Sequence, residues 1–255
     1  MRVKGSTVLL SGATGGIGEA LARGLKEAGA ELLLTGRRQH ELEELSEELG
    51  ATSVVADLAR RRDVQRLIEQ AGSVDVLIAN AAVQAGGRVG DMPVEELDDA
   101  LSVNLRAPMM LARGLIPMMA NRRRGHIVFV GSAGSRVTAP NSAVYNATKF
   151  GLRGFALALR QDLHETGIGV SIVEPVLVRD AGMFVESGLA VPRGLRTSSP
   201  QQVVRAVLTS IERNRGEAMV APVDIRVALA FGAMVPELAA RASRLLRVDF
   251  RSTPD

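Results

Sequence analysis

Short apolar segments of β character alternate with helical segments along almost the whole chain. Residues 74–79 read Val-Asp-Val-Leu-Ile-Ala, and a run this apolar indicates a strand that is buried on both faces of its sheet. Strands of this kind that alternate with helices are typical of a doubly wound parallel sheet. The sequence therefore predicts an α/β fold with a seven-stranded parallel sheet and helices on both faces.

The predicted elements cover the chain without a low-complexity linker or an internal repeat, so we expect a single domain over residues 1–255. An apolar content of 46% is enough for a substantial core. The predicted strands are 7–11, 31–35, 53–56, 74–80, 126–131, 169–175 and 218–221. The predicted helices are 17–28, 40–49, 60–71, 95–120, 144–165 and 201–213.

The composition excludes several classes of protein. The chain has no cysteine, which rules out disulfides, thiolate nucleophiles and cysteine-bound metals. No signal-like start and no long uncharged run are present, and we expect a cytoplasmic protein without a membrane-spanning segment. The three histidines, His40, His126 and His164, do not have the spacing of a metal site, and we expect them at the surface.

The basic pI of 9.9 does not indicate a nucleic-acid-binding protein. The net charge is only +3, and of the 31 basic residues three are lysines, which leaves 28 arginines. Arginine stays protonated at any ordinary pH, so it raises the pI without creating a large positive field. One tyrosine, six phenylalanines and no tryptophan are too few for base-stacking surfaces.

The first predicted strand runs into a glycine-rich segment, residues 11–18, that reads Ser-Gly-Ala-Thr-Gly-Gly-Ile-Gly and precedes a helix. Glycines permit a tight turn and let the backbone approach a pyrophosphate at the helix N-terminus, where free N–H groups favour anions. A glycine cluster alone is weak evidence, but strand, loop and helix together predict a dinucleotide site in a Rossmann-type domain.

Tyr145 is the only tyrosine, and it precedes Lys149 by four residues. On a helix, positions i and i+4 share one face, so the phenol and the ammonium would project side by side. A free phenol titrates near about 10, and a cation close to it favours its ionised form. The pair therefore predicts a proton donor that works near neutral pH, although a Y-x-x-x-K spacing alone is often just a polar helix face.

The G-x-x-x-G-x-G spacing together with Tyr145 and Lys149 resembles the short-chain dehydrogenase/reductase family over nearly the whole chain. Further matches follow in the order of that family. Asp57 and Leu58 follow the third strand, Asn80-Ala81-Ala82 ends the fourth, Asn104 lies in a helix, and Ser132 ends the fifth strand 13 residues before Tyr145. Jointly these matches are specific, whereas each alone would be weak.

The resemblance implies roles for these residues in hydride transfer to a carbonyl. Tyr145 would donate the proton, Ser132 would hydrogen-bond the same oxygen, Lys149 would lower the tyrosine pKa and bind the nicotinamide ribose, and Asn104 would position a water. Ser135 is a nearby competitor for Ser132, and Asn104 alone could be only a helix-bending residue. The implied cofactor contacts are Gly12, Thr14, Gly16, Ile17, Gly18, Asp57, Leu58, Asn80, Ala81, Tyr145, Lys149, Pro175 and Val178.

The end of the second strand decides the cofactor. An NAD site has a carboxylate about 20 residues beyond the glycine loop, whereas this chain has Arg37 and Arg38 there. Arginine pairs well with a 2′-phosphate, so the sequence favours NADPH over NAD, with Arg37 as the first candidate and Arg38 as the second. For Arg38 the alternative is that both arginines are only solvated residues at the start of a helix.

The chain departs from the family after the sixth strand. Val176 replaces the usual glycine, and Asp180 stands where a threonine is expected. Residues 181–200 would cover the substrate, and their apolar side chains suggest a lipophilic one; these are Met183, Phe184, Val185, Leu189 and Val191. The amphipathic C-terminal extension, residues 225–255, would cover the pocket or pack against a second subunit, with membrane binding as an alternative.

We therefore expect an NADPH-dependent carbonyl reductase, reversible as an alcohol dehydrogenase, that forms a homodimer or a homotetramer through its long helices. A 3-oxoacyl carrier-protein reductase is the alternative within enzymes, because Arg122, Arg123 and Arg124 lie where such relatives present basic residues to an acidic carrier. A non-catalytic NADPH sensor is the alternative from another class, but a sensor has no need of an activated phenol.

Overall fold

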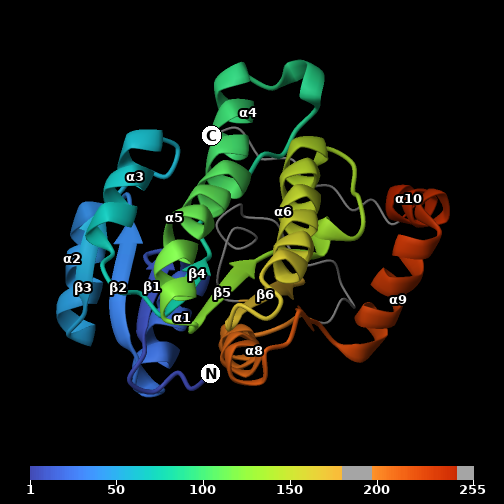
Figure 1. The fold of residues 1–255 in the computed structure, drawn as a ribbon. Helices are drawn as coiled ribbons and strands as arrows, with labels where there is room; N and C mark the ends of the chain where they lie inside the picture. The colour runs from blue at the N-terminus through green and yellow to red at the C-terminus, as the bar shows by residue number, and fades with distance from the viewer. Residues whose placement is uncertain (180–196, 246–255) are drawn as a thin grey trace.

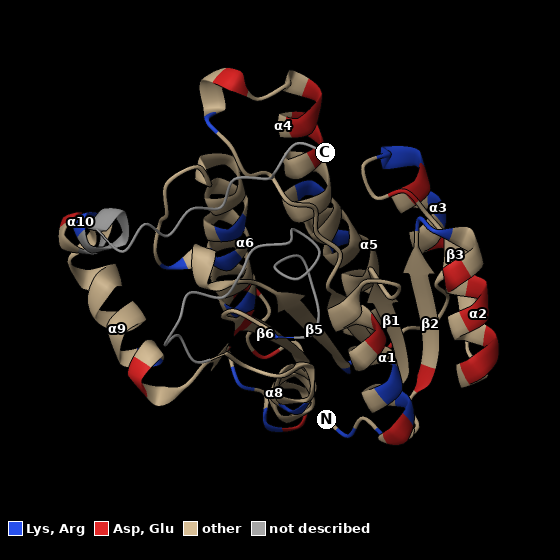
Figure 2. Ribbon diagram, turned by 180° about the vertical axis from the view of Figure 1, so that it is seen from behind, with Lys and Arg blue, Asp and Glu red and all other residues tan. Residues whose placement is uncertain are grey.

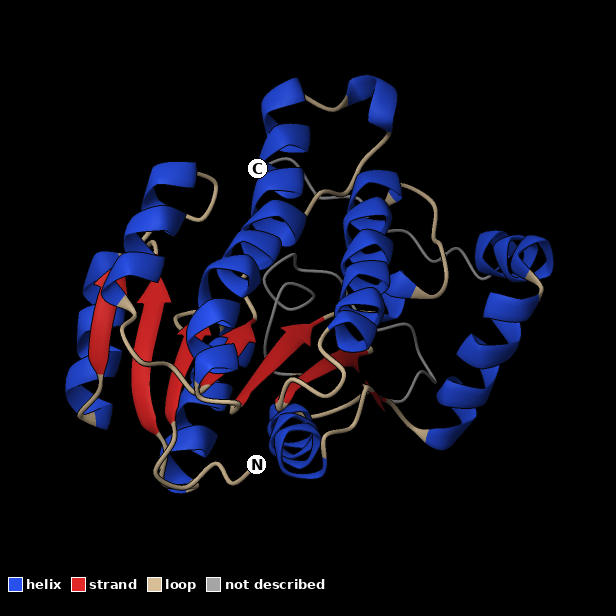
Figure 3. Ribbon diagram, in the orientation of Figure 1, coloured by secondary structure: helices blue, strands red, loops and turns tan. Residues whose placement is uncertain are grey.

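A computed structural model describes residues 1–179 and 197–245 of the chain, as one α/β domain (Figure 1). Seven parallel strands form one sheet in the order β3-β2-β1-β4-β5-β6-β7. Figure 3 shows the strand ends gathered along one edge of this sheet, with helices before and behind it. The strands are β1 Thr7–Ser11, β2 Glu31–Gly36, β3 Thr52–Val55, β4 Val76–Ala79, β5 Gly125–Val130, β6 Ile168–Pro175 and β7 Glu217–Val220.

Most helices lie close to the predicted ranges, but the last two, within residues 223–245, are not among the predicted helices. The helices are α1 Gly16–Glu27, α2 Gln39–Leu49, α3 Arg61–Gln70, α4 Val94–Leu101, α5 Ala107–Asn121, α6 Ala143–Asp162, α8 Pro200–Arg213, α9 Val223–Met234 and α10 Pro236–Leu245. Short 3-10 turns lie at Val89–Asp91 and Ala133–Ser135. The single helix predicted over 95–120 is interrupted, because a π-helical turn, Ser102–Arg106, joins α4 to α5.

Alternate residues of each central strand face two separate apolar layers, as the period of a strand requires. Val8 and Leu10 of β1 face a layer formed with α1, α2 and α8, whereas Leu9 faces a layer formed with α3, α5 and α6. Figure 2 shows that the charged residues lie mainly on the outer helices, with acidic groups on α2 and α4. The sheet is therefore buried on both faces, which confirms the fold predicted from the sequence.

The last two helices lie beside the β7 end of the sheet rather than on one of its faces (Figure 1). Phe231 on α9 is 56% exposed and Leu238 on α10 is 55% exposed. The functions suggested for the extension over 225–255 stay predictions, as does oligomer formation. No helix among the described residues is long and apolar enough to cross a membrane.

The prediction that all three histidines lie at the surface is wrong for His126. The side chains of His40 and His164 are 81% and 78% exposed, but His126 lies within β5 and is only 1% exposed. Its Nε2 lies 2.8 Å from the Ser171 hydroxyl, which donates to the Arg215 carbonyl. The Ser171 oxygen therefore accepts the Nε2 proton of a neutral imidazole. Because β5 lies between β4 and β6 in the sheet, the His126 side chain is buried even though it is polar.

Burial lowers the pKa of His126 from 6.5 to about 3, with smaller contributions from the amino terminus and Arg160. The unfolded chain therefore binds one more proton than the folded chain between about pH 3 and pH 6.5, and stability should fall as the pH falls through this window. We expect His126→Gln to remove part of that loss, on the order of a few kcal/mol at most, in denaturant unfolding measured from pH 7 to pH 4. His164→Gln is the control, and equal pH dependence in wild type and His126→Gln would contradict the assignment.

Candidate active site

The glycine loop follows β1 and packs closely against the segment after β4. Gly12 has φ +66°, and a Cβ atom at this position would lie 2.7 Å from Ala81 Cα. A Cβ at Gly18 would lie 1.9 Å from the Gly12 carbonyl oxygen. Both positions therefore require glycine, one for its backbone conformation and both for close approach.

The loop leaves the start of α1 open to an anion. Gly15 is the N-cap residue and provides no side-chain hydrogen bond, so the first N–H groups of the helix, at Gly16 and Ile17, have no capping partner there. These groups and the helix dipole favour a negatively charged ligand. The predicted residues Gly12, Thr14, Gly16, Ile17 and Gly18 all lie in this turn, which fits the pyrophosphate of a dinucleotide.

Asn80 and Ser11 fasten the glycine loop to the end of β4. The Asn80 amide donates to the carbonyls of Ser11 and Gly12, at 3.2 and 3.1 Å. The Ser11 hydroxyl accepts the backbone N–H groups of Asn80 and Ala81, at 3.1 and 3.2 Å. Asn80 thus shapes the loop through its side chain, and Ser11 is a site residue that the sequence analysis missed.

The two arginines after β2 lie differently. Arg38 donates from Nε to Thr14 Oγ1 at 3.4 Å and from its guanidinium to the Thr14 carbonyl, and it pairs with Glu41 at 3.7 Å. Arg37 is exposed, and within residues 1–179 and 197–245 its side chain has no hydrogen bond or ion pair. Arg38 is therefore part of the loop wall, and Arg37 is available to a ligand.

Asp57 and Leu58 follow β3 as predicted, but the carboxylate of Asp57 is engaged locally. Its Oδ1 accepts the N–H of Ala59 at 3.1 Å, and its Oδ2 lies 3.2 Å from Arg60 Nε. Leu58 is buried in the layer below. The Asp57 side chain therefore stabilises the turn into α3, and the predicted contact with adenine stays a prediction.

Ser132, Tyr145 and Lys149 converge beyond the end of β5. The Ser132 hydroxyl lies close to the Tyr145 phenol and accepts the N–H of Gly134, at 3.2 Å. Tyr145 and Lys149 are one turn apart on α6, and Lys149 Nζ lies 5.7 Å from the centre of the tyrosine ring. Lys149 is only 2% exposed and donates to the Val130 carbonyl at 3.3 Å. The structure thus brings the Ser132 hydroxyl, which is 13 residues away in the sequence, to the pair that Tyr145 and Lys149 form on α6.

The expected lowering of the tyrosine pKa by the lysine is not what the structure shows. Burial raises the pKa of Tyr145, and the hydrogen bond from Ser132 only partly opposes it. Burial also lowers the pKa of Lys149 from 10.5 to about 8, which weakens the lysine as a permanent cation. The cost of burying the charged form is the main cause of both pKa shifts.

Asn104 lies in the π-helical turn and is fully buried. Its Oδ1 accepts the Val83 N–H at 2.7 Å, and its Nδ2 donates to the Val83 carbonyl at 2.9 Å and lies 3.3 Å from Thr148 Oγ1. Thr148 in turn donates to the Tyr145 carbonyl at 2.8 Å. A π turn often marks a functional position. Here Asn104 links the π turn to the segment after β4, at Val83, and to α6, at Thr148.

Ser135 does not compete with Ser132 for the site. It is fully buried, and its hydroxyl lies between two acceptors, Glu174 Oε1 and the Ser132 carbonyl, within hydrogen-bond distance of each. Asn146 is a further residue that the sequence analysis missed, and its amide donates to the carbonyls of Gly134 and Val137. A polar residue beside Tyr145 was the only available signal for it.

The chain beyond β6 is described only as far as Arg179. Pro175 ends β6, and Val178 is buried and forms a bridge with Ser198. Asp180 and most of the segment expected to cover the substrate lie outside the described residues.

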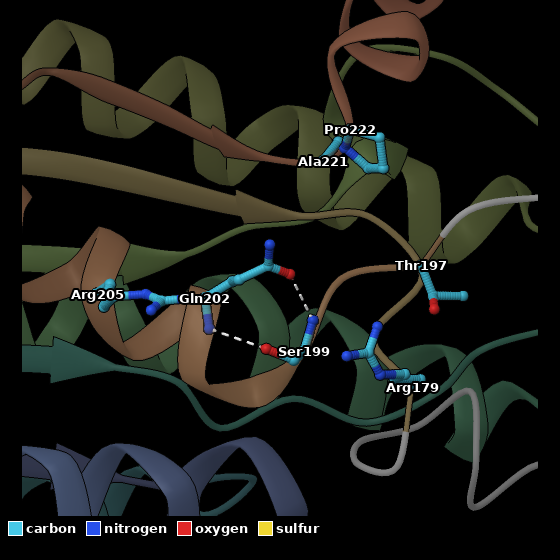
Figure 4. Close-up of a pocket in the computed structure, with 7 residues that line it drawn as sticks. All are labelled: Arg179, Thr197, Ser199, Gln202, Arg205, Ala221 and Pro222. Atoms are coloured by element: carbon cyan, nitrogen blue, oxygen red, sulfur yellow. Dashed lines mark hydrogen bonds between the residues drawn. The ribbon is translucent and has the colours of Figure 1, made fainter.

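Figure 4 shows a hollow nearby, at the start of α8, that the catalytic candidates do not line; its residues are Arg179, Thr197, Ser199, Gln202, Arg205, Ala221 and Pro222. Within the described residues, no cluster of His, Asp and Glu could bind a metal ion.

Gly12→Ala tests the close approach at the glycine loop. We expect a loss of about 1–3 kcal/mol in the free energy of unfolding and weaker NADPH binding, because the new Cβ would contact Ala81 in a strained backbone. Gly72→Ala is the matched control, since Gly72 has φ +59° but no atom within 4 Å of the added carbon. Equal effects of the two changes on stability and on the NADPH dissociation constant would show that the contact with Ala81 is unimportant.

Comparison with known proteins agrees with this geometry. The family model described as "short chain dehydrogenase" matches residues 6–192. The ketoacyl reductase HetN of Nostoc sp. is 34% identical over 226 residues, which are 85% of this chain and 78% of HetN.

Solved structures are similar over most of the fold. A serine dehydrogenase complexed with NADP+ has a TM-score of 0.78 at 29% identity, covering 86% of this chain and 95% of that one. A 3-ketoacyl-(acyl-carrier-protein) reductase from Brucella melitensis complexed with NADH has a TM-score of 0.77 at 27% identity, covering 86% and 97%. The glycine loop, the sheet order and these similarities together show that the chain belongs to the short-chain dehydrogenase/reductase family of oxidoreductases.

Proposed function

We propose that the protein is an NADPH-dependent oxidoreductase that interconverts a carbonyl and a secondary alcohol. The observation that carries the proposal is the convergence of Ser132, Tyr145 and Lys149 at the same edge of the sheet as the open start of α1. A dinucleotide bound at that helix start would extend along the carboxyl ends of the strands toward Tyr145.

The residues then have distinct tasks. The bound nicotinamide supplies or accepts the hydride. Tyr145 gives the proton to the carbonyl oxygen, and Ser132 hydrogen-bonds the same oxygen as its negative charge grows. Lys149 lies beside the phenol and can bind the ribose hydroxyls, and Asn104 positions the backbone at Val83 and the Thr148 side chain.

Two observations support NADPH as the preferred cofactor. No carboxylate follows β2, and Arg37 and Arg38 occupy that position. Arg38 already contacts the glycine loop, which leaves Arg37 to pair with the 2′-phosphate. The relatives with solved structures include complexes with NADP+ and with NADH, so the preference rests on these arginines.

An apolar cluster beside Tyr145 supports a substrate that is at least partly lipophilic. Tyr145 packs against a small buried apolar cluster of Ala85, Ala100 and Val144, against which Val83, Met92 and Leu97 also pack. Apolar side chains around one polar reaction centre are typical of a small-molecule pocket.

Reduction of a 3-oxoacyl group is the second candidate, because HetN and the Brucella protein carry such names. The run Arg122–Arg124 gives this candidate little support within one chain. These arginines precede β5, so they lie at the opposite edge of the sheet from Ser132. They also bond to neighbouring groups, Arg122 to the Val74 carbonyl and Arg123 to the Glu165 carbonyl.

Tyr145→Phe tests the proposed mechanism. We expect kcat for carbonyl reduction to fall by about 10²–10⁴-fold, because only the proton donor is removed, while the NADPH dissociation constant stays nearly unchanged. NADPH oxidation should be followed with a panel of ketones and acyl thioesters. Activity close to that of the wild type would rule out Tyr145 as the acid.

Two single substitutions separate the roles of the arginines. We expect Arg37→Ala to lower kcat/KM with NADPH by about 10-fold or more and to leave NADH use nearly unchanged, because only the phosphate partner is lost. Arg38→Ala should weaken both cofactors, since it also removes the contact with Thr14. An unchanged NADPH/NADH ratio in the first variant would exclude Arg37 as the selector.

A further inference from the structure

Four charged side chains form a closed ring of ion pairs behind the catalytic serine. Arg136 Nε and Nη2 lie 2.8 Å from Glu174 Oε2 and 2.8 Å from Glu217 Oε1, respectively. Arg153 Nε lies 2.7 Å from Glu217 Oε1 and 3.7 Å from Glu174 Oε1. We call these four residues the ion-pair ring. Its members come from the segment after β5, from α6, from β6 and from β7, so the ring ties together the elements that surround the site.

Glu174 is the buried member of the ring. Its side chain is 0% exposed, whereas that of Glu217 at the other end is 31% exposed. A buried carboxylate is costly unless each oxygen is bonded, and here both oxygens have partners. Among the described residues, loss of Glu174 would therefore leave the positive charges of Arg136 and Arg153 with Glu217 as their remaining carboxylate partner.

The turn after β5 that carries Ser132, residues 132–136, is bonded directly to Glu174. We call it the serine turn. The Ser135 hydroxyl donates to Glu174 Oε1, and the Ser135 N–H donates to the Ser132 carbonyl at 3.0 Å. A Cβ at Gly131 would lie 3.2 Å from Glu174 Cγ, so the glutamate side chain passes close to the backbone just before Ser132. The same carboxylate thus contacts this turn through Ser135 and Arg136 and along Gly131.

The ring also reaches the helix that carries the tyrosine. Arg153 lies on α6, four residues after Lys149 and eight after Tyr145, on the same face of the helix. The carboxylate of Glu174 is therefore shared between the serine turn and the tyrosine helix. Tyr145 packs on the turn that carries Ser132, since a Cβ at Gly134 would lie 3.3 Å from Tyr145 Cε1, and a shift between these elements would therefore move the phenol relative to the Ser132 hydroxyl.

We propose that Glu174 is a positioning residue for carbonyl reduction: through Ser135, Arg136 and Arg153 it sets the Ser132 hydroxyl against the Tyr145 phenol. This inference rests on the proposed function for its kinetic consequence, but the geometry it describes exists without substrate. A purely structural ion pair would stabilise the fold without setting the position of the Ser132 hydroxyl relative to the Tyr145 phenol.

Glu174→Gln is the principal test, since it preserves shape and removes the charge and one acceptor. We expect kcat to fall about 10-fold or more, as misplaced reacting groups cost rate, with the NADPH dissociation constant nearly unchanged. In a Ser132→Ala background the same change should have little further effect, because the group through which Glu174 acts is already gone. Independent, multiplying losses in the double variant would overturn the proposal.

A second measurement needs neither substrate nor turnover. The chain has one tyrosine, so labelling with [13Cζ]tyrosine gives a single NMR resonance that reports the phenol of Tyr145. We expect the resonance of Glu174→Gln at neutral pH to move from the wild-type position toward that of Ser132→Ala. Glu217→Gln leaves both direct partners of Glu174 in the serine turn in place, and its resonance should stay near that of the wild type.

The kinetic and NMR results together distinguish failure of the proposed function from failure of the positioning role of Glu174. If no carbonyl substrate is reduced by the wild type, the proposed function fails, and the resonance still decides the positioning role. If Glu174→Gln does not fold, Ser135→Ala removes only the hydroxyl link and should move the resonance in the same direction by a smaller amount. A resonance that stays at the wild-type position in the folded variant overturns the inference.

Discussion

Burial of the sheet on both faces is the constraint on which the rest of this structure depends. Alternate residues of the central strands enter one of two apolar layers, so most strand positions cannot carry a polar group. Polar side chains with chemical tasks gather where the strands end. Ser11, Asn80 and Ser132 each lie at or just after the end of a strand, which places the glycine loop and Ser132 at one edge.

The buried charges at this edge are stabilised in different ways. Glu174 lies in a strand that is otherwise uncharged, and two arginines and a serine compensate it. Among the described residues, Lys149 has one hydrogen-bond acceptor, the Val130 carbonyl, and burial lowers its pKa to about 8. A well-compensated carboxylate makes a rigid support, whereas the lysine is less well compensated. This contrast fits a positioning residue beside a residue of the reaction centre.

Hydrogen bonds to the backbone explain why distant segments keep their places. Asn104 makes two bonds to Val83 and contacts Thr148, so it links the π turn to the segment after β4 and to α6. Asn80 does the same for the glycine loop. Both asparagines therefore act on the site through the backbone that they orient, and their side chains face protein groups.

The sequence by itself determined the parallel α/β fold, the glycine loop and the pairing of Tyr145 with Lys149, because each depends on local periodicity, spacing or a single residue type. The pattern of apolar residues along one strand or one helix indicates which face is buried, and the buried layers of the structure agree with that pattern. The sequence did not reveal that His126 is buried, since its burial comes from pairing with two neighbouring strands. Only the tertiary structure decided that burial, rather than the lysine, dominates the pKa of Tyr145. It also decided that Glu174 meets Arg136 and Arg153, because these residues are far apart in the chain and meet only when β6, α6 and the serine turn pack together.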